Sequence, residues 1–411
     1  MTSAQGDSRP STASPGIARL DILGFRTLRE TSLRAGPLNA LVGEANAGKS
    51  NVLAAIATVL GHSEPPSERQ ETSPAFSIRA HLGDGGVVST GSAVELDVPD
   101  THRPCPIYLP SSLRSSTLVA TGHVAHHRAA GAHRMLTSAL HEQLGADPRP
   151  SPASVAGGLV TALERCCDEG MGGFVFLVEE PELYLRPQAQ RYLYRVLHQL
   201  ADEGSQVFYS THSPAFLNVA RMEELNLVTR DPVLGTRLAR PQPLPASESF
   251  RVMSEFDAER GEVFLAEAAM LVEGRTEKLA LPHVFSALGH DPDQSGISIV
   301  ECGGKANIVM LARVCRAFGV PFCVVHDRDA PAGRQPSVGE RRLNEEIARL
   351  AGSEHVVVLE PDFEGVSGLR RHNHKPEQAW RAFHGLTREA VPPPLARVVE
   401  LAIGLATRAG R

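Results

Sequence analysis

The sequence has no uninterrupted apolar run that approaches the ~20 residues of a membrane-spanning helix, which argues against a transmembrane protein and a membrane partner. Residues 1–15 also have no apolar core and are rich in Ser, Thr, Pro and Gly. We therefore expect a flexible tail there rather than a signal peptide.

The cysteines form no C-x-x-C pair and no zinc-finger spacing. Without an export signal, the reduced thiols of a cytoplasmic protein are the expected state. The six positions are Cys105, Cys166, Cys167, Cys302, Cys315 and Cys323.

The sequence also has no excess of positive charge. It contains 41 Lys and Arg residues and 47 Asp and Glu residues, which give a formal net charge of −6. A nucleic-acid enzyme of this charge needs a local basic groove, or metal ions that bridge its carboxylates to phosphate. With 42% hydrophobic and 21% charged residues, the 411-residue chain is expected to be globular and long enough for two domains. Composition leaves the substrate open.

One segment, Gly43-Glu44-Ala45-Asn46-Ala47-Gly48-Lys49-Ser50, matches the phosphate-binding pattern G-x-x-x-x-G-K-[ST] at every fixed position. It follows a predicted strand at 38–42 and opens a predicted helix at 51–60, which is the context that the pattern requires. Backbone N–H groups of such a loop surround phosphates, Lys49 can reach the β- and γ-phosphates, and Ser50 can complete Mg²⁺ coordination. The expected ATP-binding residues are Gly43, Glu44, Asn46, Ala47, Gly48, Lys49, Ser50 and Asn51.

Two further polar motifs follow apolar strands in the first half of the chain. The strand at 174–178 ends in Glu179 and Glu180, and we assign Glu179 to the nucleotide-bound metal and Glu180 to the general base. The strand at 206–210 leads to His212, which could contact the γ-phosphate. Taken singly, an ordinary acidic turn and a capping or surface histidine would explain these features.

A second set of alternating strands and helices carries a group of acidic residues. Glu273 follows a predicted strand at 268–272, Glu277 lies four residues on, and Asp327 and Asp329 follow a strand at 321–326. Carboxylates at the carboxyl ends of parallel strands converge at one edge of an open α/β sheet. Clustered like charges are costly unless Mg²⁺ or Mn²⁺ neutralises them, and such ions can activate water for phosphodiester cleavage. A single D-x-D could be a loop accident, but its combination with E-G-x-x-E favours a metal site.

The first half resembles the ABC ATPases of the branch that includes the structural-maintenance-of-chromosomes proteins. The run E-E-P-E-x-x-L-x-P from Glu179 and the run S-T-H-S-P around His212 correspond to their Walker B, D-loop and switch-histidine motifs. Two features depart from that pattern. Glu179 stands where most ABC ATPases have Asp, and the signature motif has only a poor candidate in Ser154-Val155-Ala156-Gly157-Gly158.

The second half resembles a Toprim domain, and the order of the two halves resembles the OLD (overcoming lysogenization defect) family of nucleases. The turn Gly303-Gly304-Lys305 and the segments Asp362-Phe363-Glu364 and Lys375-Pro376 add to this resemblance. It implies that Glu273 is a general base or metal ligand and that Asp327, Asp329 and Glu364 are metal ligands. Lys375 would stabilise charge on the scissile phosphate.

The expected fold class is α/β, with an ABC-type P-loop ATPase domain followed by a Toprim domain that has a Rossmann-like, mostly parallel sheet. The expected organisation is a tail at 1–15, the ATPase domain at 16–230, a linker at 231–265, the Toprim domain at 266–385 and a helical tail at 386–411.

The resemblance implies a DNA endonuclease or nickase that depends on ATP and on Mg²⁺ or Mn²⁺, acting in defence against phage or plasmids. It also implies a homodimer through the ATPase domains and a possible helicase partner. Two alternatives stay open. One is a DNA-repair ATPase whose Toprim half binds nucleic acid but barely cuts, and the other is a Toprim nuclease that acts on RNA.

Overall fold

The computed structural model describes residues 16–61, 75–91, 104–111, 127–145, 151–170, 172–241, 258–328, 336–369 and 375–409. The chain divides into two compact units, the first formed by residues up to 217 with 223–240, and the second by 218–222 with the residues from 241 onward. None of the helices in the described ranges is both long enough and apolar enough to span a bilayer.

A single mixed sheet forms the base of the first unit. Its strands are β1 (Ile17–Phe25), β2 (Leu28–Arg34), β3 (Leu38–Val42), β4 (Ser77–Leu82), β5 (Val87–Gly91), β6 (Cys105–Leu109), β7 (Phe174–Glu179), β8 (Gln206–Thr211), β9 (Leu225–Asp231) and β10 (Gly235–Ala239). They are arranged in the order β5-β4-β1-β2-β10-β9-β3-β8-β7-β6. The half that contains β3, β8, β7 and β6 is parallel, whereas β1, β2, β4 and β5 pair antiparallel.

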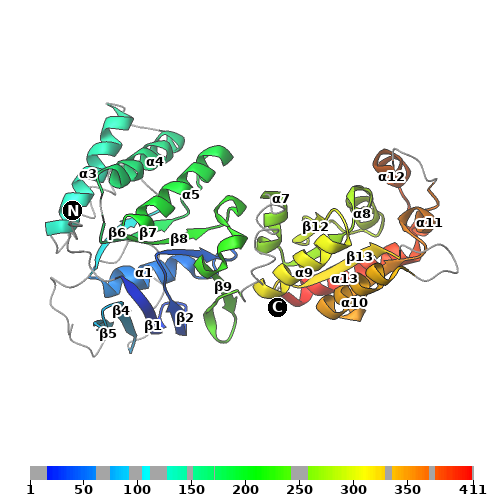
Figure 1. The fold of residues 1–411 in the computed structure, drawn as a ribbon, viewed down its shortest axis with the longest axis horizontal. Coiled ribbons are helices and arrows are strands. Elements are labelled where there is room, and N and C mark those ends of the chain that lie inside the picture. Colours follow the sequence, from blue (N-terminus) through cyan, green and yellow to red (C-terminus); the bar gives the residue numbers. More distant parts are fainter. Residues whose placement is uncertain are drawn as a thin grey trace, which may run out of the picture. The chain divides into compact units, whose positions relative to one another are not determined.

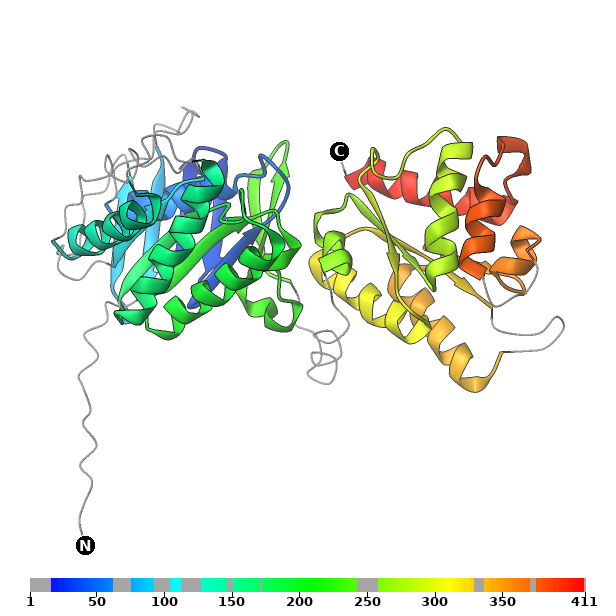
Figure 2. The same cartoon turned by 90° about the horizontal axis from the view of Figure 1, so that it is seen from above.

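Helices cover both faces of the parallel part of this sheet (Figures 1 and 2). They are α1 (Lys49–Val59), α3 (His127–Leu144), α4 (Pro152–Asp168) and α5 (Pro187–Asp202). The apolar side of α1 packs against alternate residues of β7 and β8, such as Val175, Leu177 and Phe208, and against β1 and β4. Because the turn before α1 continues from β3, this packing places the phosphate-binding loop at the carboxyl ends of β3, β8 and β7.

The second unit has a four-stranded sheet in which all strands run parallel. Its strands are β11 (Ala268–Val272), β12 (Ile297–Glu301), β13 (Phe322–Asp327) and β14 (Val356–Leu359), in the order β12-β11-β13-β14. Its main helices are α8 (Arg275–Ala287), α9 (Lys305–Phe318), α10 (Val338–Ala351), α11 (Phe363–Ser367), α12 (Lys375–Phe383) and α13 (Pro393–Ala409). Side chains of α8, α12 and α13 pack together on one face of the sheet, with Met270 and Val325 at the centre of that core.

The predicted fold class is confirmed, and the strands predicted at 38–42 and 268–272 have those bounds in the structure. Two segments differ from the expected organisation. β10 lies within the expected linker and pairs with β9 and β2, because Pro232 and Pro241 flank the strand rather than interrupt it. The expected C-terminal tail contains α13, which packs on β11 and β13 as part of the second unit's core.

Candidate functional site

Two glycines let the phosphate-binding loop lie directly against the neighbouring strands. A Cβ atom on Gly43 would lie 2.0 Å from the backbone oxygen of Val228 in β9. Gly48 has a φ of 108°, and a Cβ atom there would lie 2.1 Å from Oγ1 of Thr236 in β10. Side chains other than hydrogen at these two positions would push the loop off the sheet.

We expect Gly43→Ala to abolish nucleotide binding and to destabilise the first unit by about 1–3 kcal/mol, because the backbone of β9 would have to move. The unfolding temperature should then fall by several degrees, measured by calorimetry, with nucleotide binding measured by titration. Gly36→Ala is the matched control, since its Cβ would have Leu38 O at 3.9 Å as its nearest neighbour. Equal unfolding temperatures for the two variants would contradict this prediction.

Polar side chains from β9, β10 and the turn between β1 and β2 brace the loop and the start of α1. Thr236 donates its hydroxyl to the backbone oxygen of Ala47 at 2.8 Å, and Arg230 donates to the backbone oxygen of Asn46 at 3.3 Å. Asn51 donates to Oγ1 of Thr27 at 2.7 Å. The sequence analysis missed Thr236, Arg230 and Thr27, because each lies far along the chain from the motif.

The Lys49 side chain lies inside its own loop. Its ammonium donates to the backbone oxygens of Gly43 at 2.8 Å and Glu44 at 2.6 Å. Burial lowers the pKa of Lys49 to about 8, although the negative charges of Glu180, Glu182 and Glu44 act in the opposite direction. The ammonium is therefore held by carbonyls at the place from which it could reach a bound phosphate, while Ser50 is exposed at the start of α1.

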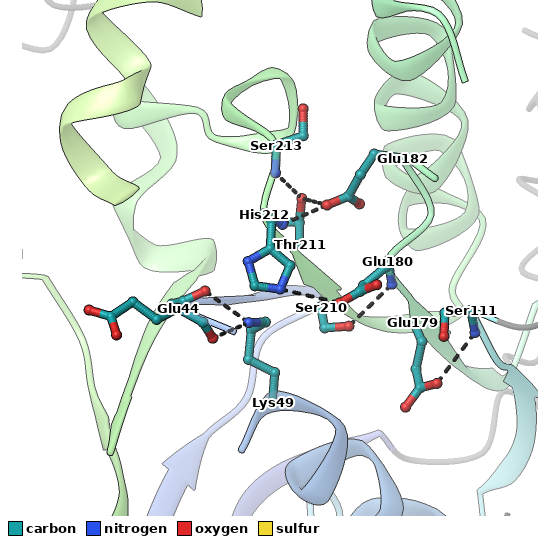
Figure 3. A network of polar contacts seen from close by, with 11 residues as sticks. Glu44, Lys49, Ser111, Glu179, Glu180, Glu182, Ser210, Thr211, His212 and Ser213 are labelled. Atoms are coloured by element: carbon teal, nitrogen blue, oxygen red, sulfur yellow. Dashed lines mark hydrogen bonds and ion pairs between the residues drawn. The ribbon is translucent and has the colours of Figure 1, made fainter. Parts of the chain in front are cut away.

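Glu179 ends β7 with both of its carboxylate oxygens held. Tyr108 of β6 donates its hydroxyl to Oε1 at 2.7 Å, and the Ser111 amide donates to Oε2 at 3.3 Å (the latter drawn in Figure 3). Burial and the charge of Glu179 raise the pKa of Tyr108 above its usual range, so its hydroxyl keeps its proton. Tyr108 was missed by the sequence analysis, which did not predict β6.

Glu180 and His212 face each other across the ends of β7 and β8 (Figure 3). Nε2 of His212 lies 3.2 Å from Oε1 of Glu180. Glu180 has a φ of 42°, and its amide donates to the backbone oxygen of Ser210 at 3.0 Å. Burial, followed by the positive charge of Lys49, lowers the pKa of His212. The structure thus brings Lys49, Glu180 and His212 together in one polar site, and their roles toward a nucleotide stay predictions.

The candidate signature residues lie in the first turns of α4, the helix that precedes β7 in the chain. Ser151 caps this helix by accepting a hydrogen bond from the Ser154 amide at 3.2 Å. The assignment of this segment as a signature motif stays a prediction from the sequence.

In the second unit, four acidic residues come together at the carboxyl edge of the parallel sheet. Glu273 follows β11 and accepts the Asp327 amide at 3.2 Å, while Asp327 ends β13 and accepts the Phe363 amide at 2.8 Å. Glu277 in the first turn of α8 and Glu364 in α11 are both buried. The register places Asp327 beside Leu359 of β14 and Glu273 directly after β11.

These carboxylates act on one another electrostatically. Burial raises the pKa of Asp327 to about 7, and the charges of Glu277, Glu273 and Glu364 add to this. Burial also raises the pKa of Glu277, with further contributions from Glu273 and Glu364. Two buried and two half-buried acids in one place are costly to ionise unless a cation neutralises them, and carboxylate oxygens are ligands that divalent ions such as Mg²⁺ accept.

Within the described ranges, no three His, Cys, Asp or Glu side chains are arranged as a finished metal-binding group. Asp329 lies outside the described residues, and so does the side chain of Lys375 at the start of α12. The ligand set predicted from the sequence therefore stays a prediction for Glu273, Glu277, Asp327, Asp329 and Glu364.

Asp327→Asn is expected to weaken the pH dependence of stability in metal-free protein. The pKa of Asp327 is raised from 3.8 to about 7 in the folded state, so the folded state keeps a proton that the unfolded state loses within this window. That stabilisation is fully present below the unfolded pKa and is lost as pH rises through the folded pKa. Thermal unfolding with a chelator at about pH 5 and about pH 8 measures this loss of stability. If wild type and variant lose the same stability between these two pH values, the prediction is wrong.

The turn Gly303-Gly304-Lys305 lies beside Glu273. The Gly303 and Gly304 amides both donate to the backbone oxygen of Glu273 at 3.0 Å, and both glycines have positive φ. A cavity of about 280 Å³ at this turn is lined by Glu273, the turn itself, Ala306, Asn307, Glu340 and Leu343. The turn therefore fixes the backbone that carries the first carboxylate of the cluster.

Comparison with known families matches three segments of the chain. A model described as "Overcoming lysogenization defect protein-like, TOPRIM domain" matches residues 264–329. A model described as "AAA ATPase domain" matches 170–217, and "Protein of unknown function (DUF2813)" matches 16–70.

Curated relatives agree with these matches. The OLD nuclease of Thermus scotoductus is 39% identical over 214 residues, which cover 47% of this chain and 40% of that protein. The Old nuclease of Escherichia phage P2 is 29% identical over 161 residues, which cover 38% of this chain and 28% of that protein. The alignments thus span less than half the length of these relatives.

A solved structure, the C-terminal region of the Burkholderia pseudomallei OLD protein, is 16% identical, with 34% of this chain and 98% of that chain covered and a TM-score of 0.28. This likeness is too distant to add to the sequence matches. The Toprim model, the ATPase model and the sequence relatives confirm the resemblance on which the predictions were based. Over parts of both halves, the chain is thus similar to proteins of the OLD (overcoming lysogenization defect) family, with a segment that matches an ATPase model followed by one that matches a Toprim model.

Proposed function

We propose that the protein is a DNA endonuclease or nickase that depends on ATP and on Mg²⁺ or Mn²⁺. The observation that carries this proposal is the acidic cluster of the second unit, in which burial and then the neighbouring charges raise the pKa of Asp327. Two of its sequence relatives are named nucleases, which supports cutting rather than binding alone.

In the second unit, Asp327, Glu273, Glu277 and Glu364 would hold the divalent ion. A bound ion of this kind activates water and stabilises the leaving oxygen in phosphodiester cleavage. The Phe363 amide holds one oxygen of Asp327, and the Asp327 amide holds one oxygen of Glu273. These bonds orient two of the carboxylates before any ion arrives. Asp329 and Lys375 keep the roles of metal ligand and phosphate-charge stabiliser that the family resemblance implies.

In the first unit, Lys49 and the loop amides would bind the ATP phosphates, and Ser50 and Glu179 would hold the nucleotide's metal ion. Glu180 would take the proton of the attacking water, because its carboxylate lies at the strand end beside the loop. His212, at 3.2 Å from Glu180, would orient that carboxylate and contact the γ-phosphate.

The wider setting is also proposed from the family. It comprises a homodimer through the ATPase domains, a possible helicase partner, a cytoplasmic location, and a role in defence against phage or plasmids. Dimerisation would bring the α4 start of one copy to the phosphate-binding loop of the other, as in related ATPases.

Cleavage of supercoiled plasmid with Mg²⁺ or Mn²⁺, with and without ATP, tests the proposal. We expect nicked or linear product that requires the metal and changes in amount with ATP. Parallel reactions with single-stranded DNA and with tRNA separate DNA cleavage from the RNA alternative. If the protein binds DNA but cleaves none of these substrates under any of the conditions, the result would instead support the DNA-repair ATPase.

A further inference from the structure

The turn that carries the switch histidine is fastened to the segment after β7 by two side chains. Glu182 Oε1 accepts the Thr211 hydroxyl at 2.9 Å and the His212 amide at 2.5 Å (Figure 3). Gln190 in α5 accepts the Ser213 hydroxyl at 2.7 Å. Gln190 is itself held, because its amide group donates to the backbone oxygen of Leu185 at 2.9 Å.

The two oxygens of Glu182 have unequal surroundings. Oε1 accepts both hydrogen bonds from the turn, whereas Oε2 is buried and has no hydrogen-bond partner among the described residues. Only 9% of the residue is exposed. Burial raises the pKa of Glu182, and the hydrogen bonds from His212 and Thr211 act in the opposite direction. Through Oε1, this one buried carboxyl group holds both the Thr211 hydroxyl and the His212 amide.

Glu182 lies close to the proposed catalytic base, both along the chain and through His212. Glu180 and Glu182 are separated only by Pro181, and the imidazole of His212 contacts Glu180 at 3.2 Å. Glu182 thus holds the backbone amide of His212, while the imidazole ring of His212 contacts Glu180. A shift of the turn by about 1 Å would break this alignment, and misplacement of that size can cost a reaction ~10²-fold.

We propose that Glu182 is a positioning residue for ATP hydrolysis, which holds the Thr211 hydroxyl and the His212 backbone amide so that the His212 imidazole meets Glu180 and the γ-phosphate. The inference rests on the ATPase activity proposed above and assigns Glu182 a task separate from those of Glu179 and Glu180.

Glu182→Ala and Glu182→Gln make a matched pair. Glutamine can present its oxygen to Thr211 and His212, so we expect a kcat for ATP hydrolysis within about threefold of wild type. Alanine removes both hydrogen bonds, and we expect kcat to fall roughly 10- to 100-fold with little change in KM for ATP. Equal losses in both variants would overturn the inference, because charge rather than the acceptor oxygen would then matter.

A double-mutant cycle with His212 tests whether Glu182 acts through that residue. In a His212→Ala background, Glu182→Ala should cause little further loss of kcat, because the side chain that it positions is already missing. A full additional loss in that background would show that Glu182 serves the fold or another step.

Hydrogen exchange of peptides within residues 206–217 gives a readout that does not depend on hydrolysis. The His212 amide should exchange faster in Glu182→Ala than in wild type or Glu182→Gln, since its acceptor is lost. Unchanged exchange in the alanine variant would overturn the inference. If wild type hydrolyses no ATP, the proposed ATPase activity fails, and the exchange result still decides whether Glu182 holds the turn.

Discussion

Asp327→Asn is expected to reduce metal-dependent DNA cleavage by about 10³-fold while it leaves ATP hydrolysis unchanged. Asparagine keeps the acceptor for the Phe363 amide, so the local fold should persist. It removes the negative charge that lies among Glu273, Glu277 and Glu364, and with it the affinity of the site for a divalent ion. Initial rates of plasmid cleavage and of phosphate release, measured on the same protein samples, report the two activities separately.

Asp362→Asn is the matched control for this prediction. Asp362 caps α11 by accepting the Gly365 amide at 2.8 Å, and asparagine caps a helix about as well. This variant carries the same chemical change on the segment next to the acidic cluster, so its cleavage rate should stay near that of wild type. Cleavage by Asp327→Asn at the wild-type rate would place the nuclease centre elsewhere.

A thermal shift adds a measure of metal binding without catalysis. An ion that binds only the folded protein stabilises it by about 2.7 kcal/mol at a hundredfold excess over its Kd. We expect Mn²⁺ to raise the unfolding temperature of wild type and Asp362→Asn but not of Asp327→Asn. This comparison separates a loss of metal from a loss of DNA binding.

Sequence patterns predicted the parts of the molecule that depend on neighbours along the chain. The runs before Gly43 and Glu273 are short and mainly apolar, which is typical of parallel strands that are buried on both faces. The carboxyl ends of such strands share one edge, so the approach of Asp327 to Glu273 was predictable from strand order alone.

Features that depend on distant pairing were not predictable in this way. β6 contains Pro106 and is only five residues long, yet it is an edge strand, where proline is tolerated. Tyr108, which holds Glu179, was missed with it. Thr236 lies in a segment expected to be a linker, although its hydroxyl supports the phosphate-binding loop. The raised pKa of Asp327 likewise arises from burial, which no local pattern reports.

Glu180→Gln is expected to lower ATP hydrolysis by about 10²- to 10⁴-fold without loss of nucleotide binding. The amide has nearly the shape of the carboxylate and can still approach Nε2 of His212, but it cannot take a proton from water. Lys49→Ala is the comparison variant, because it removes the side chain that would bind the phosphates and should abolish both binding and hydrolysis. Nucleotide titration and phosphate release distinguish the two variants, and wild-type hydrolysis by Glu180→Gln would assign the base elsewhere.

The same pair shows how the nucleotide controls the nuclease. If ATP binding alone sets the nuclease rate, Glu180→Gln should cleave plasmid at the rate that wild type reaches with ATP, and Lys49→Ala should cleave at the nucleotide-free rate. If turnover is needed, both variants should behave like wild type without ATP. The acidic cluster and the nucleotide site belong to separate compact units, so neither substitution changes a carboxylate of the nuclease site. A changed response of cleavage to ATP in these variants would therefore report coupling between the two activities rather than damage to the nuclease.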